Sequence, residues 1–111
     1  MPLTIPERDW KVFRDLHPVA LERFCERILS EAVGLVGNTK KSSHERFLAL
    51  YRLIEKRNRE LAAAFDDMRR SAALEQLLLI QSLGLLTDEE FGRFSPDTRA
   101  RLQSLRQILE R

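Results

Sequence analysis

The most apolar stretch of the chain covers residues 72–86, where one glutamate, two glutamines and one serine are the strongly polar positions. A helix with so much apolar surface must be covered on most of its circumference. The stretch therefore predicts a central helix at about 71–84, with the other segments as its packing partners. A bilayer-spanning helix needs about 20 apolar residues, so this segment is too short to span a membrane and we expect a soluble domain.

Two helices are predicted before residue 37. Thr4 and Glu7 have the spacing of a capping box, which opens a short first helix. The ring of Pro18 disfavours helical geometry at His17, so we expect a break there. Pro18 suits the first turn of a second, amphipathic helix over residues 18–36.

The longest predicted helix covers residues 44–65 and begins at a second capping box, Ser42 and Glu45. Its apolar stripe consists of Phe47, Leu50, Tyr51, Ile54, Leu61 and Phe65. The repeat calls for an apolar side chain at 57 or 58, where the sequence has Arg57 and Asn58. We therefore expect Asn58 to be a polar residue at a core position.

The C-terminal third contains two further helix starts. Thr87 and Glu90 form a third capping box before a helix of about two turns, and Ser95 with Pro96 opens the last helix. No stretch alternates with a period of two, so no sheet is expected. We predict an all-α, single-domain protein over residues 1–111, a compact bundle of five or six helices.

Composition narrows the functional classes. The chain has 19 basic and 17 acidic residues, and this near balance argues against strong nonspecific attraction to nucleic acid or to a membrane surface. Cys25 is the only cysteine, which excludes an internal disulfide and fits a reducing compartment. The N-terminus lacks the pattern of a signal peptide. We expect a cytoplasmic protein.

The sequence shows no catalytic motif. His17 and His44 have no partner at a metal-ligand spacing, and Cys25 falls on an apolar helix face, where a thiol is ordinarily inert. The four glycines match neither a phosphate loop nor a dinucleotide fingerprint. We therefore expect no catalytic residue, no cofactor, no metal and no enzyme activity.

One polar cluster admits two interpretations. Arg57 and Asn58 lie close in sequence to Asp66 and Arg70. The favoured interpretation is structural, because buried polar side chains must find partners and can fix helix register. The alternative is a polar groove, lined by these four residues, that receives a partner or a ligand. A deep pocket that joined Arg57, Asp66 and His44 would favour an enzyme or small-ligand binder.

Nucleic-acid binding is a second alternative. The helices expected after residue 72 have the order of a helix-turn-helix, and the last one carries Arg99, Arg101 and Arg106. Such arginines could contact phosphates or base edges. Solvated helices of an arginine-rich chain often look the same, so we expect this activity to be absent.

Protein–protein contact is the favoured function. Several short helices with wide apolar faces surround the apolar centre, and exposed apolar surface is often covered by a symmetric partner. We expect an interaction or regulatory module that forms a homodimer or binds another protein. The candidate contact residues are Leu3, Trp10, Phe13 and Tyr51, with core packing as the alternative for each.

Most of the chain resembles a group of small, uncharacterised bacterial all-helical proteins. The resemblance lies in the runs HPVALERFCERIL, SSHERFLALYRLIEKRNRELAAAFDDMRRSAAL and GLLTDEEFGRFSPDTR. It implies a bacterial source and brings no activity and no catalytic residue. The run GLLTDEEF is also similar to short C-terminal helical segments of some bacterial oligomerising proteins.

Overall fold

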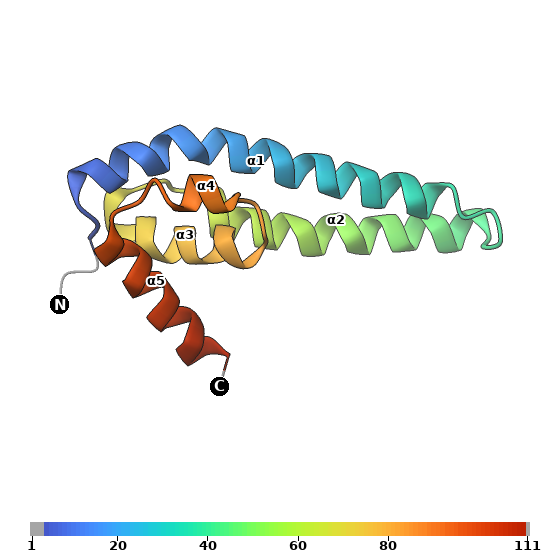
Figure 1. Ribbon diagram of the computed structural model, residues 1–111. Coiled ribbons are helices and arrows are strands. Elements are labelled where there is room, and N and C mark those ends of the chain that lie inside the picture. The colour runs from blue at the N-terminus through green and yellow to red at the C-terminus, as the bar shows by residue number, and fades with distance from the viewer. Residues whose placement is uncertain (1–3, 111) are drawn as a thin grey trace.

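The computed structural model describes residues 4–110 as an arrangement of helices without a strand. The elements are α1 (Glu7–Val36), α2 (Ser43–Phe65), the short 3₁₀ helix η1 (Arg70–Ala72), α3 (Ala73–Ser82), α4 (Asp88–Phe91) and α5 (Pro96–Leu109). Helices α1 and α2 form a long antiparallel hairpin, and the other helices lie at one end of it (Figure 1). The predicted all-α class is confirmed.

The molecule is elongated, with extents of 52 × 30 × 25 Å. Helix α3 has 10 residues and α1 has 30, so α3 spans about 15 Å of a hairpin whose first helix is about 45 Å long. Helices α3, α4 and α5 consequently cover only the half of the hairpin that holds the N-terminus (Figure 1). We call that part the basal half and the projecting part, residues 28–58, the distal hairpin.

Helix α1 runs without a break through His17 and Pro18, so the predicted break is wrong. Proline inside a helix costs about 3 kcal/mol because it removes one backbone hydrogen bond. Packing outweighs this cost, since four α1 side chains on one continuous face are buried: Phe13, Leu16, Ala20 and Phe24. The imidazole Nε2 of His17 lies 3.1 Å from the carbonyl oxygen of Phe65 and joins α1 to the end of α2.

The N-cap side chain accepts a capping hydrogen bond in three of the five α-helices, α2, α4 and α5. The capping boxes of Ser42 with Glu45 and of Thr87 with Glu90 are both present. Ser95 caps α5 with a proline at the first turn. The first helix differs, because Pro6 occupies its N-cap position without a side-chain hydrogen bond, so Thr4 does not cap it.

The core lies where α3 packs against both helices of the hairpin. As the sequence predicts, α3 is largely enclosed, and its buried residues are Ala73, Leu74, Gln76, Leu77, Leu78 and Ile80. Phe24 stacks on Phe65 with ring centroids 6.2 Å apart. The buried amide of Gln76 donates to the carbonyl oxygen of Asp66 at 2.6 Å, which fixes the loop between α2 and α3.

Asp9 connects the first helix to the last and is fully buried. Its carboxylate accepts hydrogen bonds from the Ser95 backbone at 2.8 Å, the Ser95 hydroxyl at 2.7 Å and the Thr98 hydroxyl at 2.6 Å. Burial raises the pKa of Asp9, but these hydrogen bonds outweigh it, so the pKa lies below its ordinary value. The charged form of Asp9 therefore holds the start of α5 against α1.

Two arginines of α1 bind the end of α3 and the helix that follows. Arg27 donates to the carbonyl oxygens of Leu83 and Gly84 at 2.5 and 3.4 Å, which satisfies carbonyl groups at the C-terminal end of α3. The guanidinium of Arg23 donates two hydrogen bonds to the Glu90 carboxylate in a bidentate pair, at 2.6 and 3.0 Å. Hydrogen bonds from Arg23 and from the Thr87 backbone lower the pKa of Glu90 to about 2. The basal half is thus held by polar contacts as well as by its core.

Candidate interaction surface

Six large apolar side chains of the distal hairpin are exposed to solvent. Their exposed fractions range from 51% for Val36 to 73% for Val33. The six are Leu29, Val33, Val36, Phe47, Tyr51 and Ile54, and we call them the hairpin stripe. Single exposed apolar residues are ordinary, whereas a contiguous group of this size marks an interaction site.

Helical geometry places the stripe on one face of the hairpin. On each helix the three residues have the spacing i, i+4, i+7, and they lie about 100° from the residues that face the other helix. The half-buried facing residues are Ile28, Ala32 and Leu35 on α1, and Leu50, Leu53 and Arg57 on α2. On both helices the stripe residues follow the facing residues in the same rotational direction. Because the two helices are antiparallel, the stripe residues of α1 and of α2 point to the same side of the hairpin.

A hollow between the two helices agrees with this placement. It has a volume of about 260 Å³ and is lined by residues of both helices: Val36, Ser43, Arg46, Phe47 and Leu50. Val36 of α1 and Phe47 of α2 therefore belong to one continuous surface. The buried residues of α1 in the basal half lie about 180° from the stripe, so α3, α4 and α5 occupy the opposite side.

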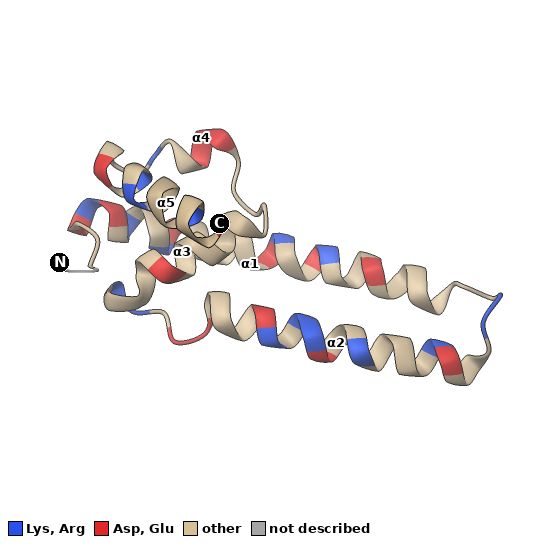
Figure 2. Ribbon diagram, turned by 90° about the horizontal axis from the view of Figure 1, so that it is seen from below, with Lys and Arg blue, Asp and Glu red and all other residues tan. Residues whose placement is uncertain are grey.

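Charged residues flank the stripe at both ends. Lys40 and Lys41 are exposed in the loop at the tip of the distal hairpin, which is blue in Figure 2. Glu22 and Glu26 are exposed on α1 toward the basal half, within about 60° of the stripe. Within residues 4–110, none of these four side chains forms an ion pair. The face is basic at the tip and acidic toward the base.

Arg57 joins the two helices behind the stripe. Its guanidinium lies 3.0 Å from Glu31 of α1 and 2.9 Å from Glu60 of α2. The hydrogen bond to Glu31 raises the pKa of Arg57, against the opposing effect of burial. Arg57 therefore links the two helices of the hairpin through charged hydrogen bonds.

Asn58 is exposed, so the expectation that it occupies a core position is wrong. It follows Ile54 by one helical turn and lies on the face of the stripe. The apolar repeat of Phe47, Tyr51 and Ile54 follows the uncovered face of α2 and not the face toward α1. Asn58 interrupts an exposed apolar surface.

The residues of the proposed polar groove have separate contacts. The backbone carbonyl of Asp66 accepts from α3, while Arg70 donates to the carbonyl oxygen of Ile5 at 2.9 Å and to the carboxylate of Glu7 at 2.9 Å. His44 and Asp66 lie at opposite ends of α2, about 33 Å apart at 1.5 Å per residue. The pocket that would join His44, Arg57 and Asp66 is therefore not formed.

The candidate partner-contact residues divide between core and surface. Phe13 is 1% exposed and belongs to the core, so it cannot contact a partner. Trp10 is half-buried, stacks on Phe13 with centroids 5.8 Å apart and lies under the guanidinium of Arg14. Tyr51 is 56% exposed within the hairpin stripe. Leu3 lies outside the described residues.

The arginines of the nucleic-acid alternative lie on α5, and two of them pair with acids of their own helix. Arg101 lies 3.3 Å from Asp97, and Arg106 lies 3.2 Å from Glu110. Arg99 is half-buried. These ion pairs reduce the positive charge that α5 presents, and no observation singles out this helix as a contact surface for phosphates.

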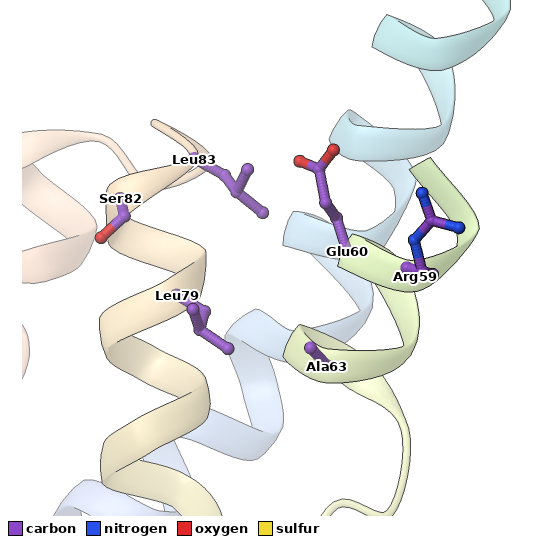
Figure 3. Close-up of a pocket in the computed structure, with 6 residues that line it drawn as sticks. All are labelled: Arg59, Glu60, Ala63, Leu79, Ser82 and Leu83. Carbon is purple, nitrogen blue, oxygen red and sulfur yellow. The ribbon is translucent and has the colours of Figure 1, made fainter. Parts of the chain in front are cut away.

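A second hollow lies between α2 and α3, with a volume of about 350 Å³ (Figure 3). Leu79 of α3 points across it toward Ala63 of α2, Leu83 just after α3 points toward Glu60, and Arg59 points away (Figure 3). The carboxylate of Glu60 at its edge is already paired with Arg57. The apolar part of the lining is formed by Ala63, Leu79 and Leu83.

Residues 4–110 contain no cluster of three or more His, Cys, Asp or Glu side chains that could hold a metal ion. No helix within that range is both long and apolar enough to span a membrane. Comparisons of this chain with protein-family models, with curated proteins and with solved structures found no match. Any functional assignment therefore depends on the geometry above.

Proposed function

We propose that this chain is a protein–protein interaction module that self-associates through the hairpin stripe. The observation that carries the proposal is the exposure of six large apolar side chains on one face of the distal hairpin. Water contact with such a surface is unfavourable, and burial of apolar area is the dominant favourable term in most protein association.

The size of the stripe supports this function. An aromatic side chain presents on the order of 150–250 Å² when exposed and an aliphatic one less, so six side chains that are 51–73% exposed present roughly 600 Å² per copy. Two copies would bury roughly 1,200 Å², which reaches the range of specific, stable interfaces. The stripe equals or exceeds the largest patch of a typical monomer, at about 300–600 Å².

The proposal assigns the module to the bacterial cytoplasm and gives it no catalytic role. A single cysteine, Cys25, suits a reducing compartment, and the sequence runs quoted above resemble bacterial proteins. The imidazole of His17 is engaged with a backbone carbonyl, and His44 stands alone at the start of α2. These observations support binding rather than chemistry.

Sedimentation equilibrium between 1 and 100 µM tests the proposal. We expect the 13.0 kDa chain to approach twice that mass, and Ile54→Asp to stay monomeric because a charge in the stripe cannot be buried unpaired. Ile108→Asp is the matched control, since Ile108 is an isoleucine of similar exposure, 61% against 53%, outside the hairpin. A wild-type chain that remains monomeric at 100 µM would refute the proposal.

A further inference from the structure

We propose that the partner at the hairpin stripe is a second copy in antiparallel orientation, so that the tip of each hairpin meets the acidic part of the other copy's α1. This inference rests on the self-association proposed above and adds its geometry. Two hairpins joined in this way form a four-helix bundle at the centre of the dimer, with the two basal halves at its opposite ends.

Symmetry leaves two ways to place these faces together. A closed dimer has a two-fold axis, and for two stacked faces this axis lies in the plane between them. If the axis runs along the hairpin, the two tips lie together and the helices of the copies are parallel in direction. If the axis runs across the hairpin, each tip lies beside the partner's basal half and α1 packs antiparallel to the partner's α1.

Charge decides between the two arrangements. With the tips together, Lys40 and Lys41 of both copies would gather at one end of the interface, where like charges repel. With the axis across the hairpin, the lysines of each copy lie opposite Glu22 and Glu26 of the other. None of these side chains forms an ion pair within the described part of the chain, so each is available for the new contact.

The spacing along α1 fits the antiparallel arrangement. The stripe on α1 runs from Leu29 to Val36, so its midpoint lies between residues 32 and 33. Glu26 lies about seven residues before this point, roughly 10 Å at 1.5 Å per residue, and Lys40 lies beyond it in the tip loop that follows the end of α1 at Val36. A two-fold axis at the midpoint therefore places Leu29 beside the partner's Val36 and the tip lysines beside the partner's glutamates.

The stripe on α2 has the same centre. It runs from Phe47 to Ile54, and the hollow that Val36 shares with Phe47 shows that the two helices reach the tip at the same level. The antiparallel axis consequently brings Phe47 of one copy beside Ile54 of the other, with the two Tyr51 residues near the axis. Because α3, α4 and α5 lie on the opposite side of the hairpin, the partner's tip meets no obstruction from these helices.

Charge reversal tests the orientation. Lys40→Glu with Lys41→Glu gives a tip variant, and Glu22→Lys with Glu26→Lys gives a base variant. At low salt we expect each variant alone to self-associate roughly tenfold more weakly than wild type, because four exposed charge pairs per dimer become repulsive. An equimolar mixture of the two variants should form a heterodimer of near wild-type affinity, since opposite charges then meet at both ends.

Thiol cross-linking gives an independent measure. In a Cys25→Ser background, a short bis-maleimide should join Glu26→Cys chains to Thr39→Cys chains in a mixture. Each variant alone should give little product, because in the antiparallel dimer the two Glu26→Cys positions lie roughly 20 Å apart along the helices and the two Thr39→Cys positions lie at opposite tips. Circular dichroism of every variant tests whether the helices are retained.

The outcomes separate the two proposals. A wild-type dimer that Ile54→Asp disrupts, combined with efficient Thr39→Cys self-cross-linking and charge-reversal variants that each self-associate as tightly as wild type, would refute the antiparallel arrangement and leave self-association intact. A monomeric wild-type chain would refute both. Weaker self-association of each charge-reversal variant alone, together with the mixed cross-link, would support the arrangement.

Discussion

The two halves of the α1–α2 hairpin have the same helices and very different surroundings. In the basal half, α3 covers the hairpin, and the buried hydrogen bonds of Asp9 and the partly exposed ion pair of Arg23 with Glu90 hold the later helices in place. In the distal hairpin the helices contact each other alone, with Arg57 as their main polar link. Apolar residues occur in both halves, but only the basal half can bury them within one chain. The contrast shows where the molecule has apolar surface left for a partner.

The largest expected difference between the halves concerns two phenylalanines. Phe24 is 1% exposed in the basal core and Phe47 is 57% exposed in the stripe. We expect Phe24→Ala to lower the free energy of unfolding by about 3–5 kcal/mol, through lost burial and a residual cavity. Phe47→Ala should cost less than about 1 kcal/mol in dilute, monomeric protein, because most of its ring is already in water.

Urea denaturation at 1 µM, below the concentration at which a dimer is expected, measures both effects. Equal losses for the two variants would contradict the contrast. At 100 µM, Phe47→Ala should also weaken self-association, whereas Phe24→Ala acts through folding alone.

The structural features that depend on residues close in sequence could be predicted from the sequence alone. The capping boxes at Ser42 and Thr87 form because their partners are three residues away. The helix break predicted at Pro18 is absent, because packing of the α1 face against α3 outweighs the missing hydrogen bond. The burial of Asp9 could not be foreseen, since its donors Ser95 and Thr98 lie 86 and 89 positions later.

The prediction that the apolar repeat of α2 marks a buried face was wrong for a different reason. Periodicity shows that Phe47, Tyr51 and Ile54 share a face, but it does not show whether that face has a partner in the same chain. The structure leaves it uncovered, and Asn58 with it. Of the candidate contact residues, Tyr51 lies in the stripe, whereas Phe13 lies in the core.

Lowering the pH should have a smaller effect on the free energy of unfolding, through Glu90 in the basal half. The pKa of Glu90 is lowered from 4.5 to about 2 in the folded protein, so its ionised form stabilises the fold above pH 4.5. This contribution is lost as the pH falls from about 4.5 toward 2. We expect it to be about 1 kcal/mol, less than the full shift implies, because Arg23 is partly exposed and solvent screens the pair.

Denaturation of wild type and Glu90→Gln at pH 6 and pH 3 measures this contribution. The variant should be less stable than wild type at pH 6, with a smaller difference at pH 3. A difference that grows on acidification would have the wrong sign for a lowered pKa.

The smallest expected effect on stability is that of Asn58→Leu. Because Asn58 is exposed and continues the stripe, the variant should change the free energy of unfolding of the monomer by less than about 0.5 kcal/mol. It should tighten self-association by a few-fold, since it extends the apolar surface. A thermal melt and sedimentation of the variant test both statements. A large gain in monomer stability would show that Asn58 occupies a buried position after all.

Hydrogen exchange at two protein concentrations tests the central claim most directly, because it reports protection of each segment. Between 1 and 100 µM, we predict that backbone amides of residues 28–36 and 47–54 become more protected, while those of α3 and α5 change little. Concentration-dependent protection in α3 or α5 with none in the distal hairpin would contradict the claim that the hairpin stripe is the contact surface.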